Sequence, residues 1–238
     1  MISTDPSTNK QLKARGRTVL LGHMGTAVLA VVLTFLIRTV LSEMSQWLLL
    51  DNKVLTLILT TILQFLAVIV IGLLDIGLCA LFLNLHYNPE AARTRDVFTA
   101  FRENTDTSIR VRSFFSIMDV LFYLPSNVLS LWLPGNGLYD YYMPVVLLIG
   151  LGMLLHFLFS VLYGISSFLI LDFPEMGPME NLRRTRQLMR GNFGRLLRLY
   201  LSFIPLYLLS GLSMGITAPW VSAYQQASRA AFYKDLME

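Results

Sequence analysis

The sequence predicts an all-α fold: a polytopic transmembrane helix bundle with about five spans and additional amphipathic helices at the interface. Three observations lead to this fold class. Hydrophobic residues make up 55% of the 238 residues and charged residues only 14%, against roughly 25% charged residues in an ordinary globular domain. The charges cluster between long apolar segments. The first apolar segment follows a polar tail without a signal-peptide pattern, so we expect it to remain as a span.

Five segments are long and apolar enough to cross a hydrocarbon core about 30 Å thick as helices. They cover residues 19–41, 54–85, 113–133, 142–171 and 196–218. The second and fourth approach about 30 residues, so we expect them to tilt, kink or project beyond the bilayer. The predicted organisation is therefore a basic cytoplasmic tail, a transmembrane helical domain and a C-terminal amphipathic helix, over residues 1–18, 19–218 and 219–238.

Lys and Arg residues predict the orientation, because they are enriched in cytoplasmic loops. Most of the 19 basic residues fall in the N-terminal tail, the connection after the second span and the connection after the fourth span. These regions meet the membrane from one side. We therefore expect a multi-pass protein in the cytoplasmic (inner) membrane of a bacterium, with its N-terminus inside. Arg38 lies near the outer end of the first span, and its side chain is expected to extend outward to the interface.

The connection after the fourth span has a helical pattern over residues 178–189. Pro178 suits the first turn of a helix, and Gly191 follows its end. One predicted face carries Arg183, Arg186, Gln187 and Arg190, and the other carries Leu182, Thr185, Leu188 and Met189. The pattern indicates an interfacial helix with its apolar side in lipid or protein and its basic side in water. Residues 96–101 are expected to begin a similar, shorter element.

The C-terminal segment 219–238 is expected to be an amphipathic helix at the interface rather than a sixth span. Gln225, Gln226 and Arg229 would each be costly at the centre of a bilayer. Its apolar stripe is formed by Trp220, Tyr224, Ala227 and Ala231. With five spans, this helix would lie on the outer side of the membrane.

Asp75 and Asp119 form the first candidate site. Both lie inside predicted spans, roughly 14 Å from the cytoplasmic boundary at the rise of an α-helix. Carboxyl groups are costly at this depth and are candidates for function. One interpretation is a protonatable or cation-binding pair, whose members influence each other, in a cavity between helices. The alternative is that each is neutral, or bonded to a hydroxyl, a backbone group or an arginine such as Arg112 or Arg195.

The second candidate site is the basic cytoplasmic face. It comprises Arg183, Arg184, Arg186, Arg190 and Arg195. Arginines at this position act as topology signals, and they also bind phosphate-bearing headgroups or an acidic partner protein. The expected partners are membrane lipids, including anionic lipids, and a second copy or another membrane protein. Nucleic acid is not expected, because the basic residues lie beside the spans.

No pattern in the sequence indicates an enzyme. It contains no G-x-S-x-G elbow, no P-loop and no H-E-x-x-H motif. His23, His86 and His156 are not spaced as metal ligands, and His156 is expected to be a hydrogen-bonded packing residue. We expect no catalytic residue, no metal and no cofactor. The preferred function is non-enzymatic binding of lipid or a partner, followed by a small transporter that uses Asp75 and Asp119, and last by a lipid-modifying enzyme.

Several motifs in the last third of the chain occur in a fixed order. They are D-x-P at 172–174, T-R-x-L-M-x-G-N at 185–192, L-S-F at 201–203, P-W at 219–220 and A-x-F-Y-x-x-L at 230–236. This order resembles domain-of-unknown-function family 975, a group of bacterial integral membrane proteins. Ala14, Arg15, Gly22 and segment 96–104 extend the resemblance to nearly the whole chain, whereas 142–150 departs from the family pattern. The resemblance implies a membrane protein of unassigned function. It is more distantly similar to the membrane domains beside some glycerophosphodiester phosphodiesterases.

Overall fold

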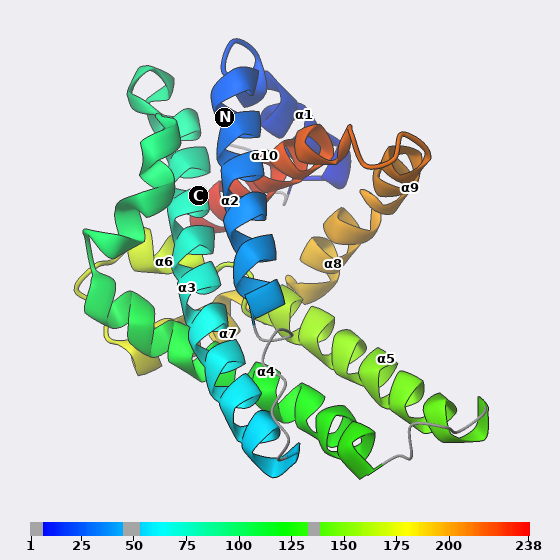
Figure 1. Ribbon diagram of the computed structural model, residues 1–238. Coiled ribbons are helices and arrows are strands. Elements are labelled where there is room, and N and C mark those ends of the chain that lie inside the picture. Colours follow the sequence, from blue (N-terminus) through cyan, green and yellow to red (C-terminus); the bar gives the residue numbers. More distant parts are fainter. Residues whose placement is uncertain (1–6, 45–52, 133–138) are drawn as a thin grey trace.

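The computed structural model describes residues 7–44, 53–132 and 139–238. Every regular element in these ranges is a helix, which confirms the all-α class. Figure 1 shows the arrangement of the helices. The chain begins with α1 (Asn9–Leu20), α2 (Met24–Met44), α3 (Lys53–Tyr87), the short 3-10 helices η2 (Pro89–Ala91) and η3 (Thr94–Phe101), and α4 (Thr105–Trp132). It continues with α5 (Tyr139–Leu162), α6 (Ser166–Asp172), α7 (Pro178–Met189), α8 (Phe193–Leu201), α9 (Ile204–Leu212) and α10 (Ala218–Met237).

Four stretches within the described residues are long and apolar enough to cross a membrane. They are Met24–Met44, Val54–Tyr87, Met143–Asp172 and Phe193–Leu212, and they match four of the five expected spans. The remaining expected span forms α4, which begins with the polar sequence TDTSIRVR and is not among the four. α4 packs against both α3 and α5, so neighbouring helices cover part of its surface.

The last expected span, 196–218, is interrupted and shorter than predicted. α8 ends at Leu201 and α9 begins at Ile204, with Pro205 in its first turn. Pro205 has no backbone N–H, so an unbroken helix could not complete its hydrogen bonds there. α9 ends at Leu212, and Met214 and Gly215 follow with φ angles of 51° and 82°. This left-handed backbone turns the chain into α10.

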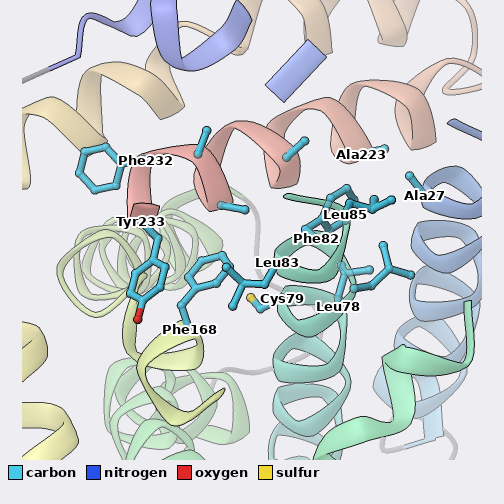
Figure 2. Close-up of a cluster of buried hydrophobic side chains, with 14 of the residues drawn as sticks. Ala27, Leu78, Cys79, Phe82, Leu83, Leu85, Phe168, Ala223, Phe232 and Tyr233 are labelled. Carbon is cyan, nitrogen blue, oxygen red and sulfur yellow. The ribbon is translucent and has the colours of Figure 1, made fainter. Parts of the chain in front are cut away.

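The core surrounds the second half of α3. Figure 2 shows Phe82 of α3 beside residues of α2 and α10, including Ala27 and Ala223. Phe168 of α6 stacks on Tyr233 of α10, with ring centroids 5.1 Å apart. The first half of α3 extends away from this core together with α4 and α5 (Figure 1).

Apolar side chains cover the surface of the extended helices and of α9. Ile58, Leu147 and Leu208 are half-exposed or more, and Leu212 is 84% exposed. Such a surface is unfavourable in water and suits contact with acyl chains. The helices that could cross a membrane therefore also have the surface that a bilayer requires.

The N-terminal segment, expected as a basic tail, is largely the helix α1. Thr8 caps it: its side chain accepts from the Gln11 backbone N–H, and the Gln11 side chain accepts from Thr8 in return. α1 packs against α10, and a Cβ at Gly16 would lie 2.8 Å from the Ser228 backbone nitrogen. Glycine at this position allows the two helices to approach closely.

α10 lies on the same side of the molecule as the N-terminal segment. Its Asp235 accepts hydrogen bonds from the backbone N–H of Ser7 at 3.3 Å. This contact argues against a C-terminal helix on the side opposite the N-terminal tail, a side that the sequence left open. The alanines of its apolar stripe, which indicated an interfacial helix, are buried against protein instead.

Reporters fused to the two chain ends should report the same side of the membrane, because Ser7 and Asp235 are in contact. The distribution of basic residues predicts that this side is cytoplasmic. A reporter after Met179 should agree with them, and one after Gly135, which lies outside the described residues, should report the opposite side. Chain ends on opposite sides would contradict the packing of α1 on α10.

Candidate functional site

The helix predicted over 178–189 is α7, with the expected bounds. Its buried face contains Leu182, Thr185 and Met189, and also Asn181. The Ser166 hydroxyl donates to Asn181 Oδ1 at 2.6 Å, and Asn181 Nδ2 donates to the Ser166 carbonyl at 3.3 Å. These bonds attach α7 to α6. The sequence left open whether the apolar side of α7 contacts lipid or protein, and the structure shows that it contacts protein.

The predicted basic face of α7 is exposed. Arg183, Arg186, Gln187 and Arg190 all point away from the core. Arg184 is partly buried, and its guanidinium lies over the Phe173 ring at 4.2 Å from the centroid. An open hollow of about 520 Å³ lies on this surface, lined by Met179, Glu180, Arg183, Arg184 and Gln187. The face therefore combines exposed cations, one carboxylate and an accessible depression.

Arg195 does not belong to this exposed face. It lies on α8, and its side chain is 17% exposed. Its guanidinium forms an ion pair with Asp235 and donates to the Ser7 carbonyl at 3.1 Å and to Asn192 Oδ1 at 2.9 Å. Arg195 therefore connects α8 to both ends of the chain. Ser7 and Asp235 lie far from Arg195 in the sequence, so helical periodicity could not identify this role.

Asp75 and Asp119 each bond to a different side chain. Arg38 donates to both carboxylate oxygens of Asp75, at 2.9 and 3.0 Å. His156 Nδ1 and Asp119 Oδ1 are hydrogen-bonded at 2.6 Å, as expected for a hydrogen-bonded histidine. The expectation that Arg38 extends outward to the interface is wrong, because its guanidinium reaches Asp75 on α3. The arginine bonded to Asp75 is therefore Arg38, and not Arg112 or Arg195, the two that the sequence suggested.

The Arg38–Asp75 and His156–Asp119 pairs both lie on the apolar helices and differ in exposure. The side chains of Asp75 and His156 are 33% and 45% exposed, whereas that of Asp119 is 12% exposed. Mutual influence between the two carboxylates stays a prediction. Asp75 is paired with Arg38 and Asp119 is hydrogen-bonded to His156, and no hydrogen bond joins the two carboxyl groups in the described residues.

Sequence reasoning named Arg112 as a possible partner of the two carboxyl groups, but it did not connect Arg229 with this region. Arg112 lies near the start of α4 and donates to the Ser167 hydroxyl at 2.6 Å. Arg229 lies on α10 and donates to the Gly164 carbonyl at 2.9 Å. Arg229 could have been found from its place among the small residues of α10, since a cation on that helix face must contact its neighbours.

The fold and these two sites are those of a multi-pass helical membrane protein, with four helical stretches that could cross a bilayer. A family model matches residues 1–238, and the chain belongs to that family, described as "Protein of unknown function (DUF975)". No curated protein and no solved structure matches the chain. These comparisons give no support to the distant resemblance to membrane domains of glycerophosphodiester phosphodiesterases.

Proposed function

We propose that this protein is a non-enzymatic integral membrane protein of the bacterial cytoplasmic membrane. It binds acidic phospholipids, or an acidic partner, at the basic face of α7, which comprises Arg183, Arg184, Arg186 and Arg190. The observation that supports this function is that the opposite face of α7 is buried. This burial fixes the helix backbone, so the exposed arginines project from the same face of α7.

The position of α7 in the chain favours lipid as the ligand. α7 connects the stretches Met143–Asp172 and Phe193–Leu212, both of which could cross a membrane. A short helix between two crossings lies close to the headgroups. Each basic residue near an anionic membrane surface contributes about 1 kcal/mol to binding, and salt screens this attraction. The three most exposed arginines together would increase the affinity by about a hundredfold.

Replacing Arg183, Arg186 and Arg190 by Gln should remove most of the acidic phospholipid that the purified full-length protein retains. The measurement is native mass spectrometry of bound lipid, with binding to vesicles containing phosphatidylglycerol at low and high salt. The matched control replaces Arg93, Arg95 and Arg102, which are also exposed, and changes the net charge by the same amount. Equal lipid loss in both variants, or no loss in either, would reduce the α7 arginines to topology signals.

A small transporter that uses Asp75 and Asp119 is a second candidate. The Arg38–Asp75 ion pair and the hydrogen-bonded His156–Asp119 pair favour it, because ionisable groups are costly within apolar helices and often mark ion or proton pathways. In a transporter, Asp75 would bind the cation or proton, so its neutralisation would abolish binding. The effect of Asp75→Asn therefore separates this candidate from the anion site described next.

A further inference from the structure

Three arginines from different helices lie near the part of α3 that carries Asp75. Arg38 comes from α2, Arg112 from α4 and Arg229 from α10. Arg38 is bonded to Asp75, Arg112 lies across Gly72 of the same helix, and Arg229 donates to Gln226, which lines the same cavity as Asp75. Among the described residues, no carboxylate is hydrogen-bonded to Arg112 or Arg229. The region therefore has an excess of positive charge.

Arg112 has an unused hydrogen-bond donor. Its side chain lies across Gly72 of α3, where a Cβ would overlap its aliphatic carbons. One terminal nitrogen donates to the Ser167 hydroxyl, and the guanidinium lies 5.4 Å from the Phe115 ring centroid. Its Nε is buried and has no hydrogen-bond partner in the described structure. A buried donor without a partner is unfavourable, and no carboxylate compensates the charge of this guanidinium through a hydrogen bond in the described residues.

Arg229 is bonded only to neutral groups. Its guanidinium donates to the Gly164 carbonyl at 2.9 Å and to Gln226 Oε1 at 2.7 Å. It also lies between two aromatic rings, with its central carbon 5.8 Å from the Phe168 centroid and 5.7 Å from that of Tyr200. These contacts orient the cation without neutralising it. An enclosed cation of this kind stabilises any anion that can approach it.

A cavity of about 130 Å³ opens beside this cluster, between α2, α3 and α10. Its polar lining is Arg38, Asp75, Thr34, Ser222 and Gln226. Phe35 lies at its edge and is 63% exposed on the apolar surface of α2. The cavity therefore has cationic and amide donors at its polar end and a lipid-compatible surface at its opening. It is large enough for a small anionic group, but not for a large soluble ligand.

We propose that this cavity binds a phosphate group through Arg38 and Gln226, with Arg112 and Arg229 supplying additional positive potential. The phosphate belongs either to the headgroup of an acidic phospholipid, whose chains lie along α2, or to free inorganic phosphate. Arg38 suits this role because its planar guanidinium can bind a phosphate in a bidentate manner. Asp75 holds Arg38 in place and at the same time limits the affinity by its own negative charge. The site uses no residue of α7, so it is independent of the proposed function.

The decisive experiment tests the sign of the charge at position 75. Full-length protein is titrated with inorganic phosphate and, separately, with short-chain phosphatidylglycerol, at constant ionic strength, and its melting temperature is recorded. Asp75→Asn should tighten binding by about tenfold, because it removes a competing anion. Arg38→Gln should weaken it by at least about tenfold. Arg38→Lys keeps the charge and should lie between wild type and Arg38→Gln.

The same titrations distinguish the sources of the phosphate and the two sites. A response to phosphate alone identifies a soluble anion, and a response only to phosphatidylglycerol identifies a headgroup; phosphatidylcholine is the lipid control. The variant in which Arg183, Arg186 and Arg190 are replaced by Gln should show the same rise in melting temperature as the wild type. It should do so even if it retains less acidic phospholipid in the experiment on the α7 face. The proposal is overturned if neither ligand raises the melting temperature, if Asp75→Asn weakens binding, or if Arg38→Lys and Arg38→Gln lose it equally.

Discussion

Gly77→Ala should destabilise the protein by about 3 kcal/mol, the upper end of the range for overpacked sites. η3 lies directly on α3 at this residue, and a Cβ at position 77 would overlap the backbone carbonyl of Val97. Backbone atoms cannot rotate away as the end of a side chain can. Either η3 must move off α3, or Val97, which is fully buried, must leave its place in the core. The measurement is the free energy of unfolding in detergent.

Gly150→Ala is the matched control, since it adds the same methyl group within a helix. No atom lies within 4 Å of a Cβ at Gly150. Alanine favours helix over glycine by about 1 kcal/mol, so this variant should be as stable as the wild type or more stable. If both variants unfold at the wild-type midpoint, η3 does not rest on α3 as the structure describes.

Asp235→Asn should cost about 3 kcal/mol of stability at neutral pH, in the range for breaking a buried ion pair. Asp235 is the common partner of Ser7, Arg195 and Arg15, and its side chain is only 7% exposed. The substitution leaves Arg195 as an enclosed cation without a counter-ion and weakens the contact between α8, α10 and the N-terminal segment. Glu238→Gln is the control, because Glu238 is 56% exposed and its distance to Arg15 is 3.8 Å.

The effect of Asp235→Asn should depend on pH. Burial alone would raise the pKa of Asp235, but the hydrogen bonds from Ser7 and Arg195 and the charge of Arg195 outweigh burial and lower the pKa below its usual value. A lowered pKa in the folded state stabilises the protein above the unfolded-state pKa, about 3.9, and this contribution is lost as the pH falls through the folded value. The difference in unfolding free energy between wild type and Asp235→Asn should therefore keep its full size of about 3 kcal/mol between about pH 5 and 7. It should shrink below about pH 4. A difference that grows on acidification would contradict the lowered pKa.

The sequence alone determined the class of the protein and its amphipathic helix. Composition and apolar segment length are local properties, and they predicted an all-α fold with helices that could cross a membrane. The 3.6-residue periodicity of α7 separated its buried residues from its exposed arginines without knowledge of what buries them. Pro178 and Gly191 marked the beginning of that helix and the turn after its end for the same local reason.

Only the tertiary structure decided which charged groups meet. Arg38 and Asp75 are 37 residues apart in the sequence, and so are Asp119 and His156. Their pairing depends on how each helix is rotated about its axis and where it crosses its neighbour, which residue spacing does not specify. The sequence left the side of α10 open for a similar reason, since counting spans cannot show that a helix returns to pack on α1. The sequence shows where each charged residue lies along the chain. Which charged residues pair depends on distances between helices, and these are set only when the helices have packed.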